Sequence, residues 1–309
     1  MFRKSPPLFA LLLLLCSQPA PAQTSASISG TIKDTTEAVL PGVSVVVKHI
    51  ETGIDRTALT DDEGRYRASN LSLGTYEITA SLAGFQTAVR SGIVLTIGRE
   101  AVVNFALKVG EVTEKVTVTG EAPLVETTSG SLGDLVDERS ATELPLNGRD
   151  LTDLLTLQAG TVSVSTATTG SRSGYSQRVS VSGARPMDNA ILMDGTETKS
   201  IDGGVPAGVS GSFVGAESVQ EFKIERNSYS AQYGGAAGGV INVVSKGGTN
   251  NFHGSVYEFV RNDNLDAANF RDASVVDASG RFAGKAKPEF KRNQFGFSLG
   301  GPIIKNKTF

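Results

Sequence analysis

The sequence predicts a mainly β protein with three successive parts: a small β-sandwich, an α+β domain, and the first strands of a β-barrel. Its 309 residues include 35 glycines and no tryptophan. Valine and threonine are abundant, as expected for strands that are separated by turns. Long amphipathic helical patterns are scarce, whereas short runs of alternating polar and apolar residues are frequent. A chain of this length can hold two or three compact domains.

The amino terminus has the layout of a secretory signal peptide. Arg3 and Lys4 precede an apolar run that ends in Leu11–Leu15, and a small-residue cleavage site, Ala-Pro-Ala, follows. The apolar run is about half as long as a membrane-spanning helix requires, so we expect residues 1–22 to be removed rather than kept as an anchor. Cys16 is the single cysteine. Because it lies in this leader, neither a disulfide framework nor a cysteine-based site is expected in the exported chain.

Residues 25–109 predict a two-sheet sandwich. Short strand-like runs alternate with turn signals, and the alternation of Tyr76, Ile78 and Ala80 marks a half-buried strand. The acidic cluster Asp61-Asp62-Glu63 lacks the carboxylate spacing of an EF-hand loop, so we expect a solvated turn that Gly64 closes rather than a calcium site. The expected strands are Ser27–Ile32, Val43–Lys48, Asp55–Thr60, Tyr66–Ala68, Gly74–Ala80, Gln86–Ile93 and Ala101–Leu107.

Residues 110–130 form a linker with one strand-competent segment. In this segment β-branched and polar residues alternate between flanking charges. An exposed strand of this kind can recruit a strand of another protein through backbone hydrogen bonds, which is β-augmentation. The same run could also be the last strand of the preceding sandwich, and the residues alone leave both interpretations open. The segment consists of Lys115, Val116, Thr117, Val118, Thr119 and Gly120.

Residues 131–248 combine a short helix with several strands. Asp150 is a suitable N-cap for a helix that carries three leucines on one face, and Gly160 lies beyond its end. A strand is expected at 177–183, and a second one ends in a tight turn at Asp194-Gly195.

The glycine-rich stretch Tyr233–Gly239 precedes a dense apolar run, Val240–Val244. Glycines packed this closely indicate that the backbone turns sharply, or approaches another segment where a Cβ would clash.

Residues 249–309 have the character of barrel strands. Phe252–Val260 has about the length of a tilted barrel strand, and Gln294–Gly300 alternates large apolar with small or polar residues, as a strand between lipid and lumen does. A soluble amphipathic strand would show the same pattern. The polar stretch 262–292 between them predicts an external loop. Two strands cannot close a barrel, so we expect a barrel that is incomplete within this sequence.

A catalytic constellation is not recognisable in the sequence. His49 and His253 are the only histidines, and neither begins a zinc-binding motif. The glycines at 234–239 lack the Lys-Ser/Thr that a phosphate-binding loop requires. The net charge of −3 includes no basic block, which argues against a nucleic-acid partner. We therefore expect no enzyme, no metal and no cofactor, and the sequence identifies no ligand-binding residue.

Several segments resemble parts of the TonB-dependent outer-membrane receptors of the Oar-like kind. The pattern ISGTIKD…LPGVSVVV…LSLGTYEITASLAGF resembles the carboxypeptidase regulatory-like domain, a transthyretin-like sandwich with a carbohydrate-binding-like fold. EKVTVTG resembles the TonB box, and LPLNGRDLTDLLTLQAG and YGGAAGGVINVVSKGG resemble the opening and the end of the plug domain. The domain order implied is signal peptide 1–22, sandwich 25–109, linker with the TonB-box-like strand 110–130, plug 131–248 and the start of a transmembrane barrel at 249–309.

This resemblance implies the N-terminal part of a receptor that takes up a scarce solute across the Gram-negative outer membrane. The sandwich and plug would face the periplasm, and Lys115–Gly120 would pair with the TonB protein to receive energy from the inner membrane. Outer-membrane lipid and an extracellular solute (a siderophore, oligosaccharide or peptide) would be the other partners. The alternative is a secreted or surface β-sandwich module that binds carbohydrate or protein without transport activity.

Overall fold

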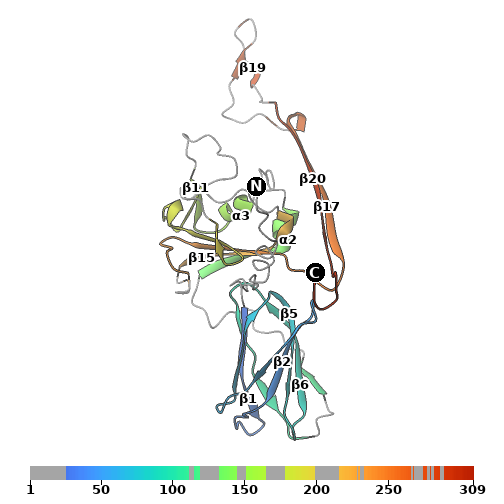
Figure 1. Cartoon of the computed structure of the whole chain (residues 1–309). Coiled ribbons are helices and arrows are strands. Elements are labelled where there is room, and N and C mark those ends of the chain that lie inside the picture. The colour runs from blue at the N-terminus through green and yellow to red at the C-terminus, as the bar shows by residue number, and fades with distance from the viewer. Residues whose placement is uncertain are drawn as a thin grey trace, which may run out of the picture.

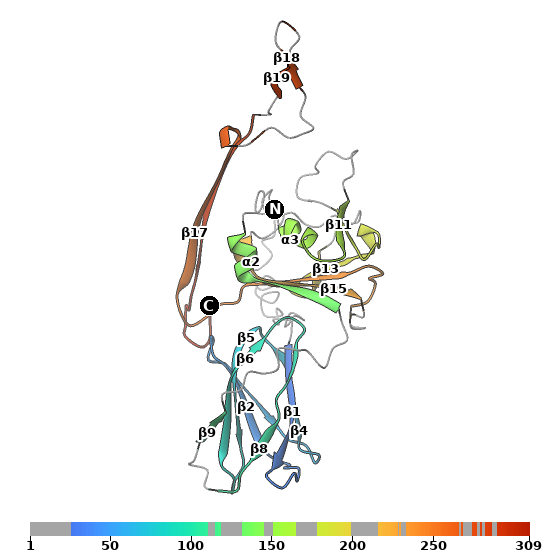
Figure 2. The same ribbon diagram turned by 180° about the vertical axis from the view of Figure 1, so that it is seen from behind.

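The computed structural model places the three parts of the chain next to one another (Figure 1). The sandwich lies beneath the sheet that contains β15 (Val219–Asn227), and a long hairpin of β17 (His253–Asn262) and β20 (Lys291–Gly300) runs beside that second part (Figures 1 and 2). The residues that the structure describes are 26–110, 115–118, 132–144, 151–164, 178–198, 216–227, 233–265, 274–276, 282–285 and 289–309, together with Tyr229, Ala267 and Ser279.

The sandwich consists of two sheets that enclose one hydrophobic core. Tyr76, Ile78 and Ala80 are buried in this core, as their alternation predicted. One sheet contains β4 (Arg65–Leu71), β1 (Ala26–Asp34), β7 (Glu100–Val102) and β8 (Phe105–Leu107). The other has the strand order β3 (Asp55–Leu59), β2 (Ser44–His49), β5 (Gly74–Ser81), β6 (Thr87–Leu95) and β9 (Lys115–Val118).

The prediction of a single strand at Ala101–Leu107 is wrong, because the structure divides this segment between β7 and β8. Both pair in parallel with successive stretches of β1. At the break, the Thr31 amide donates to Asn104 Oδ1 over 2.8 Å and the Tyr66 hydroxyl donates to the Val103 carbonyl over 2.7 Å. The Val103 amide still donates to the Ser29 carbonyl over 2.7 Å, so side chains take over only part of the ladder at the break. The alternation of residue types does not indicate such a break.

The acidic cluster of the sandwich forms a solvated turn, as predicted. Gly64 has a φ of +69°, and its amide donates to the Asp61 carbonyl over 2.9 Å. The amide of Arg65 donates to Asp61 Oδ1, and this bond is the main reason that the pKa of Asp61 lies below its usual value. The Arg65 guanidinium thus pairs with the carboxylates of Asp61 and Glu63, and Asp61 also accepts amides of the turn.

The second part is a five-stranded sheet with helices on one face (Figures 1 and 2). Phe222 and Ile224 of β15 are buried on that face, together with Leu154 and Leu155. The strand order is β10 (Leu132–Asp137), β15, β16 (Val240–Ser245), β13 (Ala190–Met193) and β14 (Thr196–Glu197). The remaining elements are α2 (Glu138–Glu143), α3 (Leu151–Thr156), the paired strands β11 (Thr161–Val164) and β12 (Arg178–Val181), and the 3₁₀ turns η1 (Pro186–Asp188) and η2 (Ala216–Ser218).

The sequence predicted α3 but not α2. The side chain of Asp137 accepts a hydrogen bond from the Ser140 amide over 2.9 Å and so caps α2 at its amino end. An Asp followed three residues later by a Ser predicts a helix start only weakly. The helix itself has only six residues, which is too short to show a helical period in the sequence. Within the described stretches, no helix is long and apolar enough to cross a membrane.

The turn at Asp194-Gly195 is a two-residue hairpin, as predicted. The two residues have φ values of +47° and +80° and connect the antiparallel strands β13 and β14. Asp194 Oδ1 also accepts the amide of Ser245 over 2.9 Å, which ties this turn to the end of β16.

The hairpin of β17 and β20 has one largely apolar face, on which Glu258 lies between Val256 and Val260 and opposite Phe295. Its register is continuous from the pair His253–Gly300 to the pair Asn262–Lys291. On the opposite face the Ser255 hydroxyl donates to Glu217 over 3.0 Å, so that face lies toward the second part. The connection contains η3 (Asp263–Leu265), β18 (Ser274–Val276) and β19 (Phe282–Lys285). The exposed apolar side chains, each at least 60% exposed, are Val256, Val260, Phe295, Phe297 and Leu299.

Candidate functional site

The predicted coupling strand forms β9 at the edge of the sandwich. Lys115–Val118 pairs in parallel with the first four residues of β6, Thr87 to Arg90, whereas Thr119 and Gly120 lie outside the described residues. This position agrees with the interpretation of a last sandwich strand. It is also compatible with β-augmentation, because the backbone groups on the outer side of an edge strand can pair with a further strand.

The sandwich contacts the second part through the loop that follows β6. Ile97 of this loop is 2% exposed, and its amide donates to the carboxylate of Glu221 on β15. Burial raises the pKa of Glu221 to about 7, although the Ile97 amide and the charge of Lys223 both favour the ionised carboxylate. The sequence did not predict this contact, since its two partners are 124 residues apart.

Polar side chains surround Glu221 on the sheet face that points toward the sandwich. Lys223 pairs with Glu225 over 3.0 Å, and Asn242 donates to the Tyr233 hydroxyl over 3.3 Å. Val244, the register partner of Glu221 on β16, belongs to the hydrophobic cluster of the sandwich. The two parts therefore share a packed interface and not only a linker.

The glycine-rich turn before β16 combines a sharp turn with a close approach, as predicted. Gly235 has a φ of +77°, which favours glycine. A Cβ on Gly239 would lie 2.5 Å from Val181 Cγ1 and 3.2 Å from the Glu225 carbonyl oxygen. The Gly239 amide donates to Asn189 Oδ1 over 2.9 Å, and Asn189 in turn donates to the Val179 carbonyl over 2.7 Å. The turn therefore contacts both β12 and β15 at the start of β16.

Replacing Gly239 with alanine is expected to lower the free energy of unfolding by about 1–3 kcal/mol, because the new methyl group overpacks against Val181. Gly234→Ala is the matched control, since a Cβ there meets nothing within 4 Å. Urea denaturation of both variants tests the difference. Equal stability of the two variants would show that the close approach at Gly239 is unimportant.

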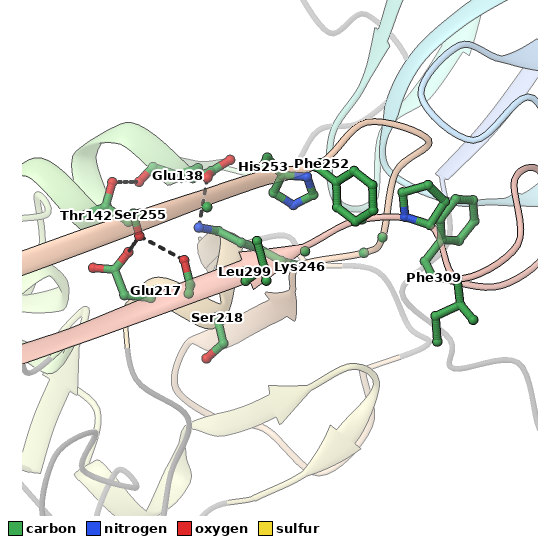
Figure 3. A pocket seen from close by; sticks show the side chains of 18 residues that line it. Glu138, Thr142, Glu217, Ser218, Lys246, Phe252, His253, Ser255, Leu299 and Phe309 are labelled. Atoms are coloured by element: carbon green, nitrogen blue, oxygen red, sulfur yellow. Dashed lines mark hydrogen bonds and ion pairs between the residues drawn. The ribbon is translucent and has the colours of Figure 1, made fainter.

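A cavity of about 740 Å³ lies where the second part meets the hairpin (Figure 3). Lys246 lines it and pairs with Glu138 over 2.8 Å. The labelled side chains lining it include Glu138, Thr142, Glu217, Ser218 and Lys246 from the second part, and Phe252, His253, Ser255, Leu299 and Phe309 from the hairpin and its ends. Residues of both parts line the cavity, so it lies at the interface between the second part and the hairpin.

Both histidines line a second cavity, of about 420 Å³, which shares lining residues with the first. The Thr52 amide donates to His49 Nδ1 over 3.1 Å, so Nε2 carries the proton and donates to the Leu73 carbonyl over 3.0 Å. His49 is therefore held by structural hydrogen bonds. In the part of the chain that the structure describes, no group of three or more His, Cys, Asp or Glu residues is placed to hold a metal ion.

Three family models match successive stretches of the chain. They are the carboxypeptidase regulatory-like domain at residues 27–108, the TonB-dependent receptor plug domain at 136–240, and the outer membrane beta barrel domain at 244–309. The strand β9 falls between the first two matches and belongs to neither.

The chain is similar to two curated receptors along much of its length. It is 29% identical over 313 aligned residues to the TonB-dependent transporter Oar of Myxococcus xanthus, with 96% of this chain and 27% of that protein covered. It is 29% identical over 203 residues to the probable TonB-dependent siderophore receptor PirA of Acinetobacter baumannii, with 62% and 23% covered.

A solved structure of the siderophore receptor PirA from Acinetobacter baumannii matches with a TM-score of 0.41 and 26% identity, over 58% of this chain and 24% of that chain. The chain spans about a quarter of the length of the two curated relatives. The regulatory-like, plug and barrel domains follow one another in this order, and the similarity to Oar covers 96% of the chain. The chain therefore contains a TonB-dependent receptor plug domain between a carboxypeptidase regulatory-like domain and an outer membrane beta barrel domain.

Proposed function

We propose that this chain is the N-terminal part of a receptor that takes up a scarce solute across the outer membrane with energy coupled from the inner membrane. The order of the domains carries this proposal, because the strand Lys115–Gly120 lies between the sandwich and the plug. A plug that occludes a barrel needs an external source of work, and an exposed strand before it can transmit a pull from the TonB protein by β-augmentation.

The arrangement of the parts supports a division of the chain like that expected from the sequence. In this proposal residues 1–22 are a cleaved leader, 25–109 the sandwich, 110–130 the coupling linker, 131–248 the plug and 249–309 the beginning of the barrel. The sandwich and plug would face the periplasm. The apolar face of the β17–β20 hairpin would contact lipid, because its side chains are exposed while the opposite face lies toward the plug.

The solute is proposed to be an extracellular small molecule. Two relatives are named as a siderophore receptor and a ferrienterobactin receptor, which favours a siderophore over an oligosaccharide or a peptide. The work would come from the inner membrane through TonB, so the proposed activity requires neither a cofactor nor a catalytic residue in this chain.

The direct test is binding of a peptide of residues 110–130 to the periplasmic domain of the cognate TonB protein. Prolines at Val116 and Val118 remove two backbone donors without a change of charge, so they should abolish binding. A control peptide with prolines at Val125 and Thr127 lies outside the strand and should bind like the unmodified peptide. Absence of binding by the unmodified peptide would instead favour a binding module without transport activity.

A further inference from the structure

The edge of the sandwich offers an ordered place for the coupling strand. β6 is paired with β5 on one side and with β9 on the other, and β9 is the last strand of the sheet. The family match to the sandwich ends at residue 108, so β9 is an addition to that domain. The sheet thus extends by four residues of the linker that precedes the plug.

The stretch of β6 that holds β9 is covered on both faces. Ala88 belongs to the sandwich core, whereas Thr87 and Val89 point to the outer face and are nevertheless only 7% and 6% exposed. Val94, on the same outer face beyond the paired stretch, is 49% exposed. On the outer face, the two residues of the stretch that pairs with β9, Thr87 and Val89, are therefore buried when β9 is in place, whereas Val94 beyond it is not.

The pairing leaves the second edge of β9 for a partner. Among the described strands only β6 pairs with β9. A free peptide loses about 1–2 kcal/mol of backbone entropy for each residue that becomes extended on binding. A strand already extended on β6 avoids most of this loss, and such preorganisation increases affinity.

We propose that the sandwich is a scaffold that presents the coupling strand, and that the strand of the TonB protein adds at the outer edge of β9 as a sixth strand of the sandwich sheet. This inference rests on the proposed function. It assigns to the sandwich a role in binding the periplasmic partner rather than in binding the solute.

The scaffold is also connected to the plug. β6 ends at Leu95, and two residues later the Ile97 amide donates to Glu221 of the plug sheet. A partner strand that pairs with β9 is therefore connected to the plug through β6 and the Ile97–Glu221 hydrogen bond, in addition to the covalent linker.

The test uses a full-length receptor with cysteines at Val89 and Thr117, which are register partners across β6 and β9. Oxidation without TonB should produce an intramolecular disulfide in this variant. A control pair at Val94 and Thr117 should not form one, because Val94 lies beyond the paired stretch. Equal yields for the two pairs would overturn the docking of β9 on β6.

The second measurement compares the affinity of the TonB periplasmic domain for three molecules: the 110–130 peptide, the reduced variant and the oxidised variant. Both forms of the receptor should bind about tenfold or more tightly than the peptide, because β9 is preorganised. Loss of binding on oxidation would overturn the inference, since TonB would then require a released strand. If neither the peptide nor the receptor binds, the proposed function itself fails, while the disulfide yields still decide where β9 docks.

Discussion

Replacing Phe222 with alanine is expected to lower the free energy of unfolding of the plug by about 3–5 kcal/mol. Phe222 is 1% exposed and packs in one buried cluster with Ile224, Leu154 and Leu155. Alanine would leave a cavity between the sheet and the helices that cover it. The sandwich core is a different cluster, which includes Val244 of β16 but none of these four residues, so the stability of the sandwich should change little.

Hydrogen exchange resolved by segment measures this difference, because amides of β15 and β16 report on the plug and amides of β2 and β5 on the sandwich. Leu135→Ala is a suitable control, since Leu135 is 45% exposed on the neighbouring strand β10. Its effect should stay within about 0.5 kcal/mol. Equal losses of protection in the two variants would contradict the position of Phe222 in the plug core.

Replacing Glu221 with glutamine is expected to remove a pH dependence from the contact between sandwich and plug. Burial raises the pKa of Glu221 from 4.5 to about 7, so the folded protein favours the protonated carboxyl. Its stabilising effect is complete below about pH 4.5 and is lost as the pH rises through about 7. The wild-type interface should therefore be weaker at pH 8 than at pH 5, by on the order of 2–3 kcal/mol.

Glutamine stays neutral and can still accept the Ile97 amide, so Glu221→Gln should be more stable than wild type at pH 8 and similar to it at pH 5. Urea denaturation at both pH values tests this. Glu143→Gln, a change of an exposed carboxylate on α2, controls for the loss of one charge. A wild-type protein that is more stable at pH 8 than at pH 5, with Glu221→Gln equally so, would contradict the account.

The sequence predicted the elements whose burial alternates along a strand. Tyr76, Ile78 and Ala80 follow a period of two, and the structure buries all three. The glycine-rich turn was predictable as well, because only a residue without a Cβ fits at Gly239. The turn at Asp194-Gly195 has a short-range signal that specifies its geometry.

Other features depended on contacts between distant residues. The break between β7 and β8 is stabilised by Asn104 and Tyr66, whose partners lie 73 and 37 residues away. The contact between Ile97 and Glu221 joins two domains, and periodicity predicts which face of a strand is buried but not what covers it. The same limit applies to the proposed coupling strand, whose alternation predicted a strand but not its parallel pairing with β6.

Disulfide cross-linking in cells tests the central claim, that Lys115–Gly120 is the energy-coupling strand, most directly. Cys16 is the only cysteine and lies in the expected leader, so Thr117→Cys introduces a unique thiol into the exported chain. With a TonB protein that carries cysteines along its receptor-binding strand, Thr117→Cys should form an intermolecular disulfide. Val94→Cys, an exposed site on β6, should not, and prolines at Val116 and Val118 should abolish the adduct. A Thr117→Cys receptor that forms no more adduct than the Val94→Cys receptor would contradict the account.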